Sequence, residues 1–173
     1  MRMKFIDHVI ITTFWVFAFT ALVFEPLYYF GCDWKYENCQ TSPFKLVFWV
    51  GEVWAIYNKW DPMFWDLPMW LRVMCAIEVL IFGPLYALTA YGLQHRSKWL
   101  PHVALPFAGA LFYSTIVYFT MEFIENLPGT NHFMVFIVNI PWSIFPVLLC
   151  YRIFQLYDIY PIRTSTLKDD KAK

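Results

Sequence analysis

Charged side chains are scarce in this chain of 173 residues: they make up 15% of it, against about 25% in an ordinary soluble domain. No run of lysine and arginine is present and the formal net charge is zero, so nucleic acid is not expected as a partner. The sequence has no glycine-rich phosphate loop and no Ser/His/Asp pattern, and its four histidines lack metal-ligand spacing. We therefore expect no metal and no cofactor.

What the sequence does have is hydrophobic residues, 60% of the chain, in four long blocks separated by polar segments. A helix that spans a bilayer needs about 20 largely apolar residues, and each block is about that long. We therefore expect an all-α fold, a polytopic membrane four-helix bundle. Its helices are predicted at about 7–30, 70–94, 99–124 and 132–157. They form a single domain, residues 1–160, followed by a polar tail at 161–173.

The distribution of lysine and arginine predicts the orientation of the bundle. Arg2 and Lys4 precede the first helix, and Arg96 and Lys98 separate the second from the third. The C-terminal segment carries five more, Arg152 among them, whereas the connection "ENLPGTNH" between the third and fourth helices has none. Because positive loops stay in the cytoplasm, both termini are expected there.

The first connection, residues 31–72, is too long for a simple turn and is rich in Trp and Phe. Aromatic side chains of this kind favour the membrane interface, so we expect short interfacial or re-entrant helices that cap the bundle. Asp61-Pro62 and Leu67-Pro68 mark turns or helix starts. Two interpretations stay open: a plain aromatic belt, or a lid over a cavity.

Four cysteines are present, and two of them lie in the first connection. Cys32 and Cys39 flank "DWKYEN" on the side predicted to be non-cytoplasmic. In an oxidising compartment they could form a disulfide, although sequence spacing does not establish the geometry that a disulfide needs. Cys75 and Cys150 lie inside predicted helices and are interpreted as core residues.

Polar residues recur at one depth in all four predicted helices. At about 1.5 Å per residue, they lie roughly 8–12 Å below the non-cytoplasmic surface. The residues in this layer are Glu25, Glu78, Ser114, Thr115 and Asn139. A charge inside a bilayer is costly unless it is paired or faces a wet cavity. Two carboxylates at one depth could bind a protonated amine, or serve as an acid/base pair on an apolar substrate.

Prolines and a tryptophan favour a cavity at this depth. Pro26 follows Glu25, and Pro84 follows Glu78 by six residues. Proline removes a backbone donor and disfavours α geometry in the residue before it, so bends are expected that open space within the bundle. Trp142 lies three residues after Asn139, on nearly the same helix face, where an indole could stabilise a cation.

Short motifs occur in all four helices and in the first connection: "FEPLYY", "KWDPMFWDLPMWL", "IEVLIFGPLYALTAYGL", "YFTMEF" and "NIPW". Together they resemble the EXPERA family, which includes the sigma-2 receptor and the emopamil-binding protein, a sterol Δ8–Δ7 isomerase. The resemblance is closest to the sigma-2 receptor. It implies a multi-pass protein of the endoplasmic reticulum membrane that binds sterols or cationic amphiphiles and acts in sterol or lipid handling. The resemblance implies ligand-binding roles for Glu25, Asp61, Glu78, Asn139 and Trp142. Ser114 and Thr115 join the expected ligand-binding residues because they lie in the same polar layer.

Two other functions remain open. As an isomerase, the protein would use Glu25, Glu78, Glu122 and Trp142 as its catalytic set. Ala21 stands where the isomerase has a histidine, and Glu78 lies about one helical turn from the matching position, so binding is favoured over catalysis. The third function is that of a structural subunit in a larger membrane complex, for example in the mitochondrial inner membrane. Expected partners are a membrane lipid or sterol, a second copy of the chain, or such a complex.

Overall fold

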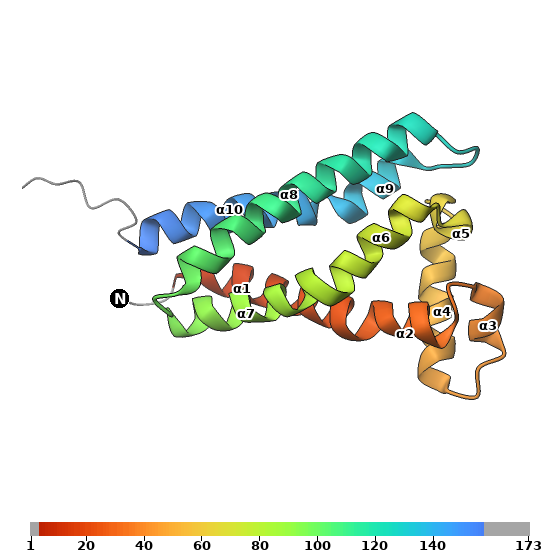
Figure 1. The fold of residues 1–173 in the computed structure, drawn as a ribbon, viewed down its shortest axis with the longest axis horizontal. Helices are drawn as coiled ribbons and strands as arrows, with labels where there is room; N and C mark the ends of the chain where they lie inside the picture. Colours follow the sequence, from red (N-terminus) through yellow and green to blue (C-terminus); the bar gives the residue numbers. More distant parts are fainter. Residues whose placement is uncertain (1–3, 158–173) are drawn as a thin grey trace, which may run out of the picture.

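The computed structural model describes residues 4–157, and the predicted polar tail lies outside them. Every regular element in this part of the chain is helical (Figure 1). Four helices are long and apolar enough to cross a membrane: Phe5–Gly31, Met69–His95, Leu100–Glu125 and His132–Leu156. The predicted all-α membrane bundle is confirmed, and each span begins and ends within two residues of the predicted positions.

Three of the four spans are composite. The first consists of α1 (Phe5–Phe19), the π-helical turn η1 (Thr20–Phe24) and α2 (Glu25–Gly31). The second consists of α6 (Met69–Ile77), the π-helical turn η2 (Glu78–Phe82) and α7 (Gly83–His95). The third is the single helix α8 (Leu100–Glu125), and the fourth is divided into α9 (His132–Asn139) and α10 (Pro141–Leu156).

Both π turns accommodate a proline. The residue before each proline donates its N–H to the carbonyl five residues earlier: Glu25 to Thr20, and Gly83 to Glu78. In a regular α-helix the proline ring would collide with the carbonyl four residues back, and the wider turn removes that collision. The expectation that Pro26 moves Glu25 out of helical geometry is wrong, because Glu25 has φ −64° and ψ −46°.

The spans pack as neighbours around an aromatic core. α1 lies against α7, and α8 lies against α10. Phe14, Phe17, Tyr86 and Phe107 meet edge to face or tilted, with ring centroids 5.2–6.4 Å apart. In Figure 1 the start of α1, the α7–α8 connection and the end of α10 share one end of the molecule. The first connection and the α8–α9 turn share the other.

The first connection contains helices, as predicted, and the structure gives their bounds: α3 (Tyr36–Gln40), α4 (Lys45–Asn58) and α5 (Met63–Asp66). α4 crosses the end of the bundle beside α2 (Figure 1). Cys32 and Cys39 form a disulfide beneath it. A Cβ at Gly51 of α4 would lie 2.4 Å from Cys39 Cβ, so glycine is required for α4 to approach the disulfide this closely.

Arg152 corrects one part of the sequence interpretation. The orientation argument counted Arg152 among the cations of the C-terminal segment. Arg152 belongs to α10, however, and its buried side chain pairs with Asp7 of α1. Arg152 Nε and Nη2 each donate to one Asp7 carboxylate oxygen, and Nη1 donates to Gln155 at 2.7 Å. Arg152 is therefore a structural residue, not a loop cation that sets orientation.

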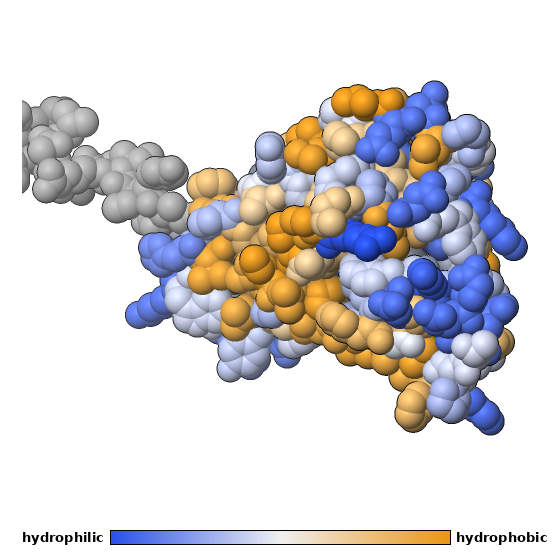
Figure 2. All heavy atoms as spheres, turned by 45° about the vertical axis from the view of Figure 1, so that its right-hand side comes forward, coloured by the Kyte–Doolittle hydropathy of each residue, from blue (hydrophilic) through white to orange (hydrophobic). Residues whose placement is uncertain are grey.

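The outer surface fits a membrane environment. Large apolar side chains of all four spans are exposed, among them Phe19, Leu80, Ile124 and Phe133. Figure 2 shows such side chains gathered over the middle of one face, with hydrophilic side chains concentrated toward the end that carries the connecting helices. This arrangement is the one expected where a hydrocarbon layer surrounds the spans.

Candidate functional site: an acidic cavity between the spans

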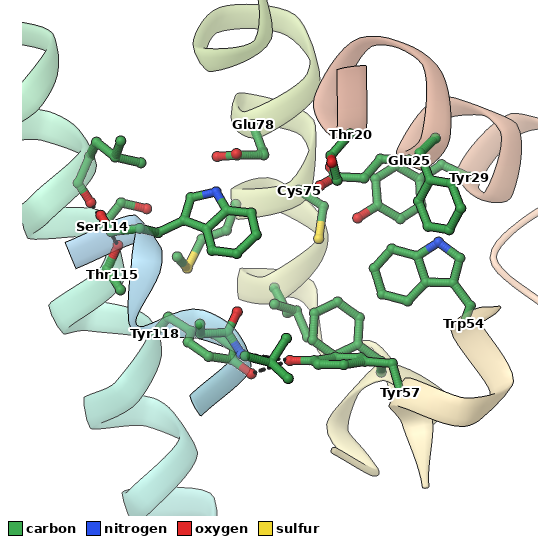
Figure 3. Close-up of a pocket in the computed structure, with 18 of the residues that line it drawn as sticks. Thr20, Glu25, Tyr29, Trp54, Tyr57, Cys75, Glu78, Ser114, Thr115 and Tyr118 are labelled. Atoms are coloured by element: carbon green, nitrogen blue, oxygen red, sulfur yellow. Dashed lines mark hydrogen bonds between the residues drawn. The ribbon is translucent and has the colours of Figure 1, made fainter. Parts of the chain in front are cut away.

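A cavity of about 270 Å³ lies between the four spans and α4 (Figure 3). Six of the seven predicted ligand-binding residues line it: Glu25, Glu78, Ser114, Thr115, Asn139 and Trp142. Depth counting along the predicted helices had placed all but Trp142 in one layer, and the structure brings them into one space. The seventh residue, Asp61, lies behind the wall, and Glu122 does not line the cavity.

Glu25 and Glu78 lie at opposite ends of the two π turns: Glu25 directly follows η1, and Glu78 is the first residue of η2. Glu78 Oε1 accepts a hydrogen bond of 2.7 Å from the Tyr86 hydroxyl. Glu25 is only 8% exposed, and its Oε2 has no hydrogen-bond partner among the described residues. The two carboxylates are close enough for their charges to interact. In Figure 3 they flank Cys75, a free thiol.

Aromatic rings form much of the remaining wall. Trp142 stacks on Phe17, with ring centroids 4.4 Å apart, and its side chain also interacts with Glu78. Trp54 stacks on Tyr28 at 4.9 Å. Indole faces are the aromatic surfaces that attract cations most strongly. The cavity therefore combines two acids with surfaces that suit either an apolar ring system or an organic cation.

Tyr57 and Tyr118 lie side by side at the opposite side of the cavity (Figure 3), and Asp61 holds both of them. Its Oδ2 accepts hydrogen bonds from the hydroxyls of Tyr57 and Tyr118, and its Oδ1 accepts from the N–H of Met63, the first residue of α5, at 3.1 Å. Asn139 Nδ2 donates to Tyr57 Oη at 2.9 Å. Burial raises the pKa of Asp61, and the bonds from Tyr118, Tyr57 and Met63 oppose that rise. Asp61 is thus a positioning residue for cavity-lining tyrosines.

A family comparison covers most of this site. The model of EXPERA (EXPanded EBP superfamily) matches residues 49–153, more than half of the chain. The chain belongs to the EXPERA family. No curated protein and no solved structure matches the chain. The matched region contains Glu78, Asn139 and Trp142, whereas Glu25 precedes it.

Sequence reasoning missed several residues of the EXPERA protein's cavity. Trp54 and Tyr57 of α4 line it, so α4 forms a wall as the lid interpretation expects. Tyr118 of α8 also lines the cavity, and its hydroxyl donates to Asp61. Tyr29 and Cys75 also line the cavity. They lie four residues after Glu25 and three before Glu78, and this helical spacing was the available signal.

Proposed function

We propose that this EXPERA protein binds sterols or cationic amphiphiles in the cavity and acts in sterol or lipid handling within a membrane. The observation that carries the proposal is the pair Glu25 and Glu78, which face one aromatic cavity at the level of the spans. This arrangement agrees with the closer resemblance of its motifs to the sigma-2 receptor.

The physical argument rests on the cost of buried charge. A carboxylate in an apolar interior is unfavourable unless it is paired or protonated. When Glu25 and Glu78 share one proton, the pair carries one negative charge, which a protonated amine would neutralise. The amine would also supply the donor that Glu25 Oε2 lacks. A sterol would contribute a hydroxyl group as donor instead, while its rings contact Trp54 and Trp142.

Charge-removing variants test the proposal directly. Glu25→Gln and Glu78→Gln should each weaken the binding of a cationic amphiphile to the purified protein by about 30-fold or more, because a desolvated charge pair contributes about 2 kcal/mol or more. Glu37→Gln removes an exposed acid of α3 and serves as the matched control. Unchanged affinity in both cavity variants would refute the proposal.

Cys75 provides a second readout, of where the ligand sits. In a Cys150→Ala background it is the remaining free thiol among the described residues. A bound amphiphile or sterol should slow its alkylation because Cys75 lines the cavity. Alkylation at the same rate with saturating ligand would place the ligand elsewhere.

Sterol isomerisation is the second candidate, favoured by the grouping of Glu25, Glu78 and Trp142 in one cavity. One acid would protonate a ring alkene, the indole would face the carbocation, and the second carboxylate would remove a proton. Ala21 in place of a histidine and the position of Glu122 outside the cavity lining weigh against it. Expression in cells that lack the isomerase, followed by sterol analysis, decides: absence of a Δ7 product excludes this activity.

We also propose residence in the endoplasmic reticulum membrane, with both termini in the cytoplasm. Support comes from the cations near the first span and the α7–α8 connection, and from the Cys32–Cys39 disulfide at the opposite end. A glycosylation acceptor inserted beside Gly129 should be modified, and one beside Ser97 should not. The reverse pattern would invert the orientation, and no modification at either place would favour the mitochondrial alternative.

A further inference from the structure

A second hollow, separate from the acidic cavity, lies where the first connection meets the second span. Its volume is about 310 Å³, and we call it the interfacial groove. The residues that line it are Asp33, Trp34, Lys35, Trp65, Leu67 and Arg72. None of these residues lines the acidic cavity.

Two unpaired cations face this groove. Arg72 Nε donates to the Leu67 carbonyl at 2.9 Å, and this bond fixes the plane of the guanidinium group while its two terminal nitrogens remain available. Neither Lys35 nor Arg72 forms an ion pair with a carboxylate among residues 4–157. Guanidinium and ammonium groups held in this way are suited to a phosphate oxygen.

The groove also offers a place for a positive group. Asp33 supplies a carboxylate, and Trp34 and Trp65 supply indole rings. Trp34 is held flat against Tyr29, with ring centroids 3.9 Å apart, and Trp65 contacts Tyr36 edge to face. Carboxylates and indole faces both attract alkylammonium groups. The groove thus presents groups of both signs and aromatic rings within one space.

Backbone strain concentrates at the same place. Asp33, Trp34 and Leu67 have φ of 49°, 62° and 41°, in the left-handed region that bulky residues rarely adopt. The Cys32–Cys39 disulfide and the bond from Asn38 Nδ2 to the Cys32 carbonyl, 3.0 Å, hold the chain on one side. Conformations of this cost persist where the surroundings enforce them, and they cluster at ligand sites.

The position of the groove favours a phospholipid headgroup as the phosphate group that Lys35 and Arg72 would bind. Asp33, Trp34 and Lys35 lie two to four residues after Gly31, the end of the first span, and Arg72 is the fourth residue of the second. The groove therefore lies at the boundary between hydrocarbon and water, where phospholipid headgroups are found.

We propose that the interfacial groove binds the headgroup of a zwitterionic membrane phospholipid. Lys35 and Arg72 hold its phosphate, while Asp33 and the indoles of Trp34 and Trp65 hold its ammonium group. This lipid site is distinct from the acidic cavity and does not depend on the function proposed for that cavity.

Native mass spectrometry of the full-length protein in detergent, titrated with short-chain phosphatidylcholine, tests the assignment. The double variant Lys35→Gln/Arg72→Gln should weaken binding on the order of tenfold or more, because it removes both phosphate contacts. The control Lys45→Gln/Lys59→Gln removes two exposed lysines of α4 and its end, and should leave binding unchanged. A thermal melt of each variant confirms that the fold is retained.

Asp33→Asn gives the sharpest discrimination, because asparagine tolerates the left-handed backbone at this position. This variant should bind phosphatidylcholine more weakly and phosphatidylglycerol more tightly than the unaltered protein. Equal losses in the groove and control double variants would overturn the proposal, as would equal binding of diacylglycerol with the same chains. Glycerophosphocholine has the same headgroup without acyl chains. If it displaced phosphatidylcholine when present at an equal concentration, the assignment to a membrane lipid would be overturned.

Discussion

Acidic residues in the apolar part of this protein differ in how completely they are paired. Asp61 accepts hydrogen bonds from three donors, and Asp7 is held by the Arg152 guanidinium. Glu25, by contrast, keeps one oxygen without a partner at the cavity wall. Glu122 also has two buried oxygens without a hydrogen-bond partner among the described residues, and nothing in the structure explains it. Incomplete pairing at a cavity wall distinguishes an acid available to a ligand from one that stabilises the fold.

The burial of Asp61 should make the stability of the folded protein depend on pH. Burial raises its pKa, so the folded protein binds this proton more tightly than the unfolded chain. The resulting stabilisation is fully present below the unfolded pKa and is lost as the pH rises through the folded pKa. The melting temperature of the unaltered protein should therefore fall relative to that of Asp61→Asn as the pH rises from about 4. Parallel melting curves across that range would contradict the burial argument.

The sequence predicted which polar residues lie together where their depth along the helices was enough to place them. Glu25, Glu78 and Asn139 could be placed together because helical rise is constant and span ends are set by the bilayer. Arg152 could not be distinguished from a loop cation, because its partner Asp7 is 145 positions away. Tyr118 was missed for the same reason, since its partner Asp61 lies in the first connection.

At the scale of elements, the two π turns determine where the acids point. Each turn accommodates a proline and has an acid at one of its ends, and the two turns contact each other. Gly83 allows this approach: a Cβ there would lie 2.7 Å from Leu22 Cδ2 and 3.3 Å from Ala21 Cβ. The sequence predicted that the helix would depart from regular α geometry near both prolines. It did not predict a π turn, because a bend also removes the clash between the proline ring and the preceding turn.

Gly83→Ala should therefore separate the two π turns. Leu22 is partly exposed and can move, whereas the Ala21 side chain is buried and cannot. We expect a loss of about 1–3 kcal/mol in the free energy of unfolding, together with weaker binding of a cationic amphiphile. Gly109→Ala is the matched control, because a Cβ there would have no neighbour within 4 Å. Equal stability of the two variants in detergent would show that the contact between the turns is unimportant.

The limits of the spans were predictable because bilayer thickness fixes their length. The placement of α4 across the bundle end was not, because it depends on contacts with Cys39 and α2 that are distant from its own sequence pattern. The Trp and Phe content and the prolines of the first connection indicated short interfacial helices there. They could not decide between a belt and a cavity wall.

At the scale of the whole molecule, the Asp7–Arg152 pair joins the start of the first span to the end of the last. The disulfide and α4 lie at the opposite end, beside the acidic cavity. The bundle is thus held at one end by a buried ion pair and capped at the other by the first connection. Loosening the ion pair should affect the stability of the bundle without removing any side chain from the cavity.

Arg152→Met tests this division. It leaves Asp7, which is 2% exposed, buried without its cation, and breaking a buried pair in this way costs about 3–5 kcal/mol. The double variant Asp7→Leu/Arg152→Met should recover much of the loss, because replacing both charges by apolar groups is often nearly neutral. Unfolding in mixed detergent measures both, with Lys98→Met as an exposed control at the same end of the molecule. Recovery in the double variant would show that the loss in Arg152→Met comes from leaving Asp7 buried without its cation. A double variant no more stable than Arg152→Met would mean that Arg152 stabilises the bundle through other contacts, such as its hydrogen bond to Gln155.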